Sequence, residues 1–256
     1  MAPVLSNAAM DEIRWFDYLW RVSSTGVEFD IARKSIGLLS GNPEALRVHF
    51  SDPAMDAVLR RTVLEQTGPE RLARELHQFL LRLDQNELVL KVALFETFMK
   101  NVHRVVLRRN PRLWKGDKTP ILLGDLVDRG FDAIVAEEIE SKLVAIDRKS
   151  VRARAEYFHD RLQAPWGPPE LVDTAHWSTK LRNRILHEDP DANVSPEDLN
   201  DTVIMALFIP GFVCQSLVDR YPDAFNPQDR INLSGRPWEN AYKGLKWIPS
   251  RAGGTG

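Results

Sequence analysis

The sequence predicts an all-α protein, and three observations support this class. Proline follows a capping residue or a glycine at several points, an arrangement typical of a helix N-terminus, where the first N–H needs no partner. Between these points apolar residues recur every three or four positions, and the alternating pattern of a strand is nearly absent. A composition of 43% apolar and 27% charged residues is that of an ordinary globular protein and argues against global disorder.

The expected helices follow from this punctuation together with the apolar spacing between the starts. Starts of this form are Asn42-Pro43, Asp52-Pro53, Gly68-Pro69, Thr119-Pro120 and Ser195-Pro196. In chain order we expect helices at 8–22, 27–40, 43–50, 53–66, 69–82, 84–109, 120–127, 129–147, 150–163, 170–188 and 196–219. The helix at 84–109 is apolar on most of its circumference, which places it inside a bundle.

The 256 residues divide into three expected regions. Residues 1–83 form an N-terminal helical extension, and residues 84–220 form a helical bundle. From 221 to 256 the chain is rich in Pro, Asn, Gly and aromatic residues, which predicts an irregular tail that packs through its aromatic side chains. Because no flexible linker intervenes near residue 83, we expect the extension to pack on the same body as the bundle.

Charge, cysteine content and hydropathy limit the function. With 34 Lys+Arg against 36 Asp+Glu the net charge is −2, which excludes indiscriminate coating of nucleic acid and leaves room for a local basic site. The single cysteine, Cys214, excludes a disulfide framework and is expected to be a buried apolar residue. The start of the chain lacks the pattern of a signal peptide, and the longest apolar run, Val203–Cys214, is about half of a bilayer span. We therefore expect a cytoplasmic protein that does not enter a membrane.

The most informative motif is the run RNRILH from Arg182 to His187. On a helical wheel Arg182 falls near the middle of an apolar face, where a guanidinium is costly unless it is paired or lines a cleft. That face is expected to comprise Leu171, Ala175, Leu181, Ile185 and Leu186. Asn183 and His187 lie four residues apart and share one flank. Arg182 and His187 are about 140° apart, so they converge only at the edge of a groove or across a symmetric pair of helices.

These residue types suit the attack of an RNA 2′-hydroxyl on the adjacent phosphodiester. Histidine supplies a base or acid near neutral pH, which makes His187 the candidate for proton transfer. Arginine supplies a fixed cation for the charge that develops on phosphate, which is the role of Arg182. Asn183 would orient the phosphate or the imidazole. The reaction requires no cofactor and no metal, and no usual metal-ligand spacing is present.

The run resembles the R-N-x-x-x-H signature of the HEPN superfamily. The arginine of the signature corresponds to Arg182, its polar second residue to Asn183 and its histidine to His187. Residues 94–99 resemble an early core helix of that family, residues 107–111 resemble the exit from it, and residues 195–198 resemble the start of the helix after the motif. The resemblance covers roughly residues 84–220.

The resemblance implies a HEPN-like bundle that acts as an endoribonuclease, in the manner of toxins and phage-defence effectors. It also implies a homodimer whose two motif helices face each other and form one composite site. RNA is then the substrate, and an antitoxin or regulatory protein is a possible partner. The alternative is a non-catalytic HEPN-like module that binds nucleotide or protein, in which Arg182 is a structural ion-pair member and His187 a surface residue. Glu96 is expected to pair with Lys100, four residues on, with Arg182 as its other possible partner.

A basic stretch between residues 100 and 118 is the candidate for binding the RNA backbone. Its cations outnumber its single acid, Asp117, and Trp114 and His103 are interleaved with them. Such a stretch suits a single-stranded backbone with a stacked base, and a solvated helix end is the alternative. The RNA-binding candidates are Arg104, Arg108, Arg109, Arg112 and Lys115.

A second resemblance points to different chemistry. Residues 124–130, GDLVDRG, resemble a metal-binding block of metallophosphoesterases. The upstream D-x-H and downstream G-N-H-E of that family do not occur in this sequence, and two-metal hydrolysis needs those further ligands. We therefore expect a short helix here, with Asp125 and Asp128 exposed.

Overall fold

The computed structural model of the chain describes residues 12–40, 69–110, 113, 127–235 and 237–250. Across these ranges the protein is mostly helical and contains no β-strand, only one isolated bridge between Ile13 and Phe225, which confirms the all-α class. The helices are α1 (Trp15–Ser40), α4 (Pro69–Arg109), α6 (Phe131–Asp147), α7 (Val151–Asp160), α8 (Pro169–His187), α9 (Pro196–Leu217), the 3₁₀ turn η3 (Pro222–Ala224), α10 (Pro227–Leu233) and α11 (Pro237–Gly244). The expected helices at 43–50, 53–66 and 120–127 fall on residues outside these ranges or reach into them only at Val127.

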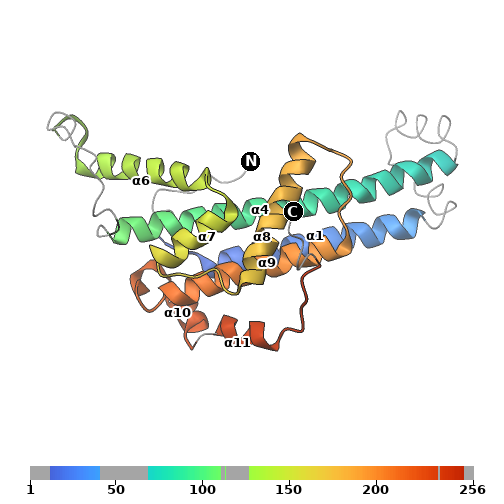
Figure 1. Ribbon diagram of the computed structural model, residues 1–256. Helices are drawn as coiled ribbons and strands as arrows, with labels where there is room; N and C mark the ends of the chain where they lie inside the picture. Colours follow the sequence, from blue (N-terminus) through green and yellow to red (C-terminus); the bar gives the residue numbers. More distant parts are fainter. Residues whose placement is uncertain (1–11, 41–68, 111–112, 114–126, 236, 251–256) are drawn as a thin grey trace, which may run out of the picture.

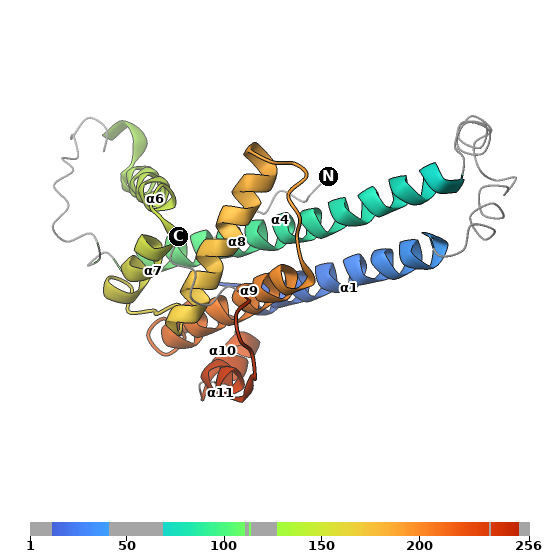
Figure 2. The same cartoon turned by 45° about the vertical axis from the view of Figure 1, so that its right-hand side comes forward.

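The long helix α4 runs the length of the molecule, with α1 beside it and α9 packed against both (Figure 1). Helix α8 crosses α4 and α9 at a steep angle, and α6 and α7 lie near the C-terminal end of α4. Turning the molecule shows α10 and α11 beneath α9, on the side away from α4 (Figure 2). The first helix of the described chain therefore packs on both α4 and α9, and the last packs on α9.

The hydrophobic core lies where α4 and α9 meet. Leu88, Val92 and Phe95 of α4 and Met205 and Ile209 of α9 are almost completely buried. Of the described helices α9 has the length and hydropathy of a membrane span, but 78% of its apolar window is buried against its neighbours, as is typical of a core helix. Its Cys214 is also buried, as expected, and burial raises the pKa of the thiol well above its usual value.

Two expected helix breaks are wrong. The segment 23–26 does not interrupt α1, and Gly26 lies beside α4, where the Lys91 ammonium is 3.6 Å from the position a β-carbon would take. The expected helices at 69–82 and 84–109 are one helix of 41 residues. Asp84 does not cap a new helix, since its carboxylate accepts a hydrogen bond of 2.6 Å from Arg33 of α1. The boundary placed at residue 83 therefore falls inside α4.

The tail is less irregular than its composition predicted. It contains η3, α10 and α11, and Asn226 caps α10 by accepting a hydrogen bond of 2.8 Å from the Asp229 N–H. The aromatic packing was predicted correctly, since the Trp238 ring meets the Trp15 ring edge-on at 5.0 Å. Asp229 also accepts hydrogen bonds from the backbone N–H groups of Trp15 and Phe16, both at 3.1 Å, so the tail caps the N-terminus of α1.

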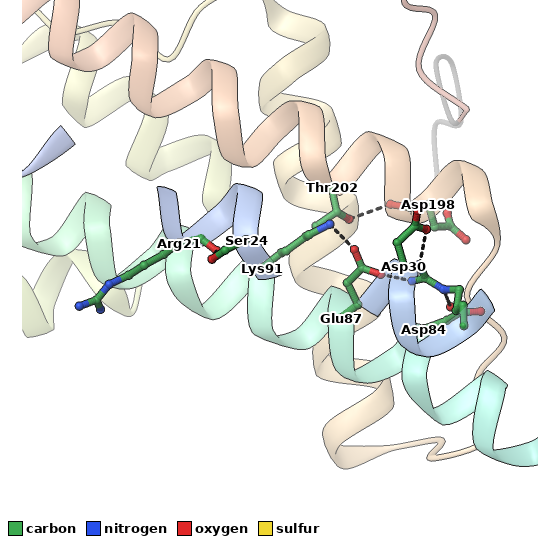
Figure 3. Close-up of polar contacts among 9 residues, drawn as sticks. Arg21, Ser24, Asp30, Asp84, Glu87, Lys91, Asp198 and Thr202 are labelled. Atoms are coloured by element: carbon green, nitrogen blue, oxygen red, sulfur yellow. Dashed lines mark hydrogen bonds and ion pairs between the residues drawn. The ribbon is translucent and has the colours of Figure 1, made fainter. Parts of the chain in front are cut away.

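A network of charged side chains lies between α1 and α4, close to α9 (Figure 3). Glu87 forms ion pairs with both Lys91 and Arg33, and Arg33 also pairs with Asp84. Lys91 is only 2% exposed, and burial, followed by the Arg33 charge, lowers the pKa of its ammonium to about 8. The network joins α1 to α4 through charge as well as through apolar packing.

Candidate functional site

Helix α8 carries the RNRILH run and packs on α4, α7 and α9. Its buried face consists of Leu171, Thr174, Ala175, Ser178 and Leu181. Beyond Leu181 this face ends: Ile185 is half-buried and Leu186, which the wheel placed on the apolar face, is 50% exposed. The last turn of α8 therefore touches the core only through Ile185, and its other side chains are accessible.

Arg182 lies at the edge of this accessible region. Its guanidinium Nη2 donates a hydrogen bond of 2.6 Å to Oε2 of Glu96 on α4, and its side chain is 21% exposed. The expected pairing of Glu96 with Lys100 is wrong. The Lys100 ammonium lies 3.0 Å from Oδ2 of Asp147 on α6 instead, so Glu96 turns towards α8.

A second arginine reaches the same carboxylate. Nη2 of Arg154, on α7, lies 3.5 Å from Oε1 of Glu96, and the Arg154 side chain is only 13% exposed. Nothing in the sequence singled out Arg154, which belongs to no motif and has an ordinary position on a short helix. Its neighbour Arg152 is exposed and pairs with Asp173 at 2.9 Å, so the two arginines of α7 have different surroundings.

Asn183 and His187 are both exposed and lie one turn apart on α8, as the spacing predicted. Between them Arg184 forms an ion pair of 2.5 Å with Asp189, just beyond the end of the helix. His187 is five residues from Arg182, which corresponds to roughly 7.5 Å along the helix axis and about 140° around it. A single copy of α8 therefore does not direct both side chains to one point.

In the described part of the basic stretch, most of the cationic side chains have partners within the protein. Arg104 donates to Glu140 at 2.6 Å, and this guanidinium lowers the pKa of the Glu140 carboxyl. Arg109 donates to the Asp223 carbonyl at 2.9 Å, and Arg108 is half-buried. Arg112, Lys115 and Trp114 lie outside the described residues.

His103 does not lie on the surface of the protein. It is 2% exposed, and its Nε2 lies 3.0 Å from the Tyr157 hydroxyl. Burial lowers the pKa of the imidazole to about 4. His103 is therefore a neutral part of the contact between α4 and α7, and it cannot stack on a base.

A cleft of about 810 Å³ opens on the other side of the molecule, between α9, α11 and the segment before α8. Pro165, Phe212, Arg220 and Tyr242 line it. Arg220 donates to the carbonyls of Leu162, Gln163 and Ser216, which occupies its guanidinium within the protein. None of the RNRILH residues lines this cleft.

Within the described part of the chain, no group of three or more His, Cys, Asp and Glu side chains is placed to hold a metal ion. Comparisons with protein-family models, with curated proteins and with solved structures give no match. The resemblance to the HEPN superfamily therefore depends on the motif and its placement on α8.

Proposed function

We propose that the protein is a metal-independent endoribonuclease of HEPN type, which cleaves RNA by attack of a 2′-hydroxyl on the adjacent phosphodiester. One observation carries the proposal. Glu96 holds the Arg182 guanidinium at the edge of the bundle, while Asn183 and His187 stand exposed on the free end of the same helix. The three residue types that this chemistry needs thus lie together on one accessible element.

In the proposed enzyme the active site is composite. Two copies of α8 face each other, so that His187 of one protomer meets Arg182 of the other and the 140° separation within one helix is overcome. His187 transfers the proton, Arg182 stabilises the charge on the phosphorane, and Asn183 orients the phosphate. The same proposal includes a HEPN-like bundle, a cytoplasmic setting as a toxin or phage-defence effector, and control by an antitoxin or regulatory protein.

The test is cleavage of total RNA in the presence of EDTA. Wild type is expected to release fragments ending in a 2′,3′-cyclic phosphate, and Arg182→Ala and His187→Ala are each expected to lose about a hundredfold or more of the rate. Arg184→Ala is the matched control, because Arg184 lies between them and pairs with Asp189. Cleavage that survives both substitutions would contradict the proposal.

Mixing the two inactive variants tests the composite site. In a mixed dimer one site regains Arg182 from one protomer and His187 from the other, so partial activity is expected to return. If each site lay within one protomer, the mixture would stay as inactive as its components.

The second candidate function is a non-catalytic HEPN-like module that binds nucleotide or protein. The observation that favours it is the 2.6 Å contact between Arg182 and Glu96, which is also the geometry of a structural ion pair. A dimer that cleaves no RNA in any form would support this function.

A further inference from the structure

The cluster around Glu96 carries more positive than negative charge. Two guanidiniums, from Arg154 of α7 and Arg182 of α8, share one carboxylate from α4. Lys100, the other cation expected near Glu96, is paired with Asp147. The three side chains are between 13% and 25% exposed, so the excess charge of about +1 is poorly hydrated.

The hydrogen-bond donors of the two arginines are mostly unused. A guanidinium has five N–H groups in a planar fork. Among the described contacts Arg182 makes one hydrogen bond, to Glu96, and Arg154 only approaches the same carboxylate at 3.5 Å. The Nε atoms of both residues are buried and have no hydrogen-bond partner within the described structure. Such poor pairing is costly for a buried cation, and a further acceptor would reduce that cost.

We infer that Arg154 and Arg182, held side by side by Glu96, form a binding site for a phosphate group. The planar forks match the oxygen atoms of phosphate, and charge-assisted bonds of this kind are strong. Glu96 contacts both guanidiniums but neutralises only one of them. The site takes the phosphate through the outer parts of the guanidiniums, since the Nε atoms are enclosed. That the phosphate belongs to an RNA backbone rests on the proposed function, because Arg182 is shared with the RNRILH run.

The first experiment measures binding of a fluorescent 2′-O-methyl RNA oligonucleotide by anisotropy over a range of KCl concentrations. This probe keeps the backbone charges but has no 2′-hydroxyl nucleophile, so binding is separated from cleavage. Arg154→Met is expected to weaken binding about tenfold and to reduce the slope of log K against log salt by about one. Glu96→Gln removes the competing carboxylate and is expected to strengthen binding.

The matched control is Arg152→Met, which removes one positive charge from the same helix outside the cluster. It is expected to leave the affinity nearly unchanged. An equal loss in Arg152→Met and Arg154→Met would mean that general surface charge binds the RNA, and would overturn the site. Unchanged affinity in Arg154→Met would overturn RNA as the ligand of the site.

A second experiment separates RNA from free phosphate as the source of the ligand. Replacing sodium chloride by inorganic phosphate at equal ionic strength is expected to raise the melting temperature of wild type more than that of Arg154→Met. The rise that both proteins share is the general stabilising effect of phosphate, and the difference between them reports the site. The phosphate effect could depend on Arg154 while Arg154→Met leaves oligonucleotide binding unchanged. That result would support the anion site and overturn RNA as its ligand.

Failure of this inference and failure of the proposed function have different readouts. If wild type cleaves RNA and Arg154→Met neither weakens binding nor loses the phosphate effect, only the site is overturned. If no RNA is cleaved but phosphate binding depends on Arg154, only the proposed enzyme is overturned. Should Arg154→Met fail to fold, the sign of the Glu96→Gln effect decides: tighter binding supports the site, and weaker or unchanged binding overturns it.

Discussion

The imidazole of His103 couples the contact between α4 and α7 to pH. Burial lowers its pKa to about 4, whereas a histidine in an unfolded chain titrates near 6.5. Between these pH values the unfolded state binds more protons than the native state. The stability that depends on neutral His103 is therefore present above about pH 6.5 and is lost as the pH falls towards 4.

We expect the free energy of unfolding to decrease between pH 6.5 and pH 4, with up to about 3 kcal/mol of the decrease due to His103. The measurement is urea unfolding at a series of pH values, compared with His103→Gln, which keeps a polar group near the Tyr157 hydroxyl. The variant is expected to show a shallower pH dependence over this window. Identical slopes for the two proteins would show that His103 is not the responsible group.

Single ion pairs were the least predictable features of the site. The spacing of Glu96 and Lys100 favoured a pair within one helix, and that rule considers no other element. In the folded chain α6 brings Asp147 to Lys100, while α7 and α8 bring two arginines to Glu96. The sequence did indicate that Arg182, on an otherwise apolar face, needs a partner.

At the scale of elements, close packing of α11 on α9 depends on one glycine. A β-carbon at Gly211 would lie 2.4 Å from a ring carbon of Trp238, so the indole occupies the space that a side chain would fill. Trp238 in turn packs edge-on against Trp15 and Phe208. Gly211 therefore permits the contact by which the tail reaches the core.

Gly211→Ala is expected to destabilise the protein by about 1–3 kcal/mol, because overpacking outweighs the better helix propensity of alanine. Urea unfolding gives the free energy, and tryptophan fluorescence reports displacement of Trp238. Gly37→Ala in α1 is the control: nothing lies within 4 Å of the added carbon, so it is expected to stabilise by up to about 1 kcal/mol. A neutral or stabilising Gly211→Ala would contradict this account.

Helix positions were predictable where proline and caps mark them, and less so where tertiary contacts continue a helix. The start of α9 at Ser195-Pro196 was found because proline follows a capping residue there, and in the structure Ser195 and Asp198 form a capping box. The continuity of α1 through 23–26 was missed because Ser, Thr and Gly are weak helix formers, whereas in the folded chain α1 packs along α4. Helix α10 could have been found, since Asn226-Pro227 repeats the start signal used elsewhere.

At the scale of the whole molecule the tail belongs to the fold. The Asp229 side chain is fully buried, and it joins α10 to the first turn of α1 through the N–H groups of Trp15 and Phe16. The backbone N–H of Ile13 also donates to the Ala224 carbonyl at 2.7 Å. The aromatic composition of the tail predicted that it packs, but no local pattern could indicate that it caps a helix more than 200 residues earlier.

Asp229→Ala is expected to cost about 2 kcal/mol or more, since it removes a helix cap and leaves the Trp15 N–H buried without its acceptor. Thermal unfolding gives the loss, and hydrogen exchange at Trp15 and Phe16 shows whether it is localised there. Asp223→Ala, in the exposed part of η3, is expected to change stability by less than about 0.5 kcal/mol. Equal effects of the two substitutions would refute the capping role.

The contact between Asp229 and α1 also sets an order for folding during synthesis. Asp229 is added to the chain 214 residues after Trp15, which takes roughly 10–40 s at ordinary translation rates. Through that interval the N–H groups of Trp15 and Phe16 lack the carboxylate that caps them in the folded chain, and Trp15 lacks its contact with Trp238. The contacts of Trp15 with Asp229 and Trp238 therefore form only after the tail has been synthesised, and a nascent chain that stalls before that point leaves α1 without this cap.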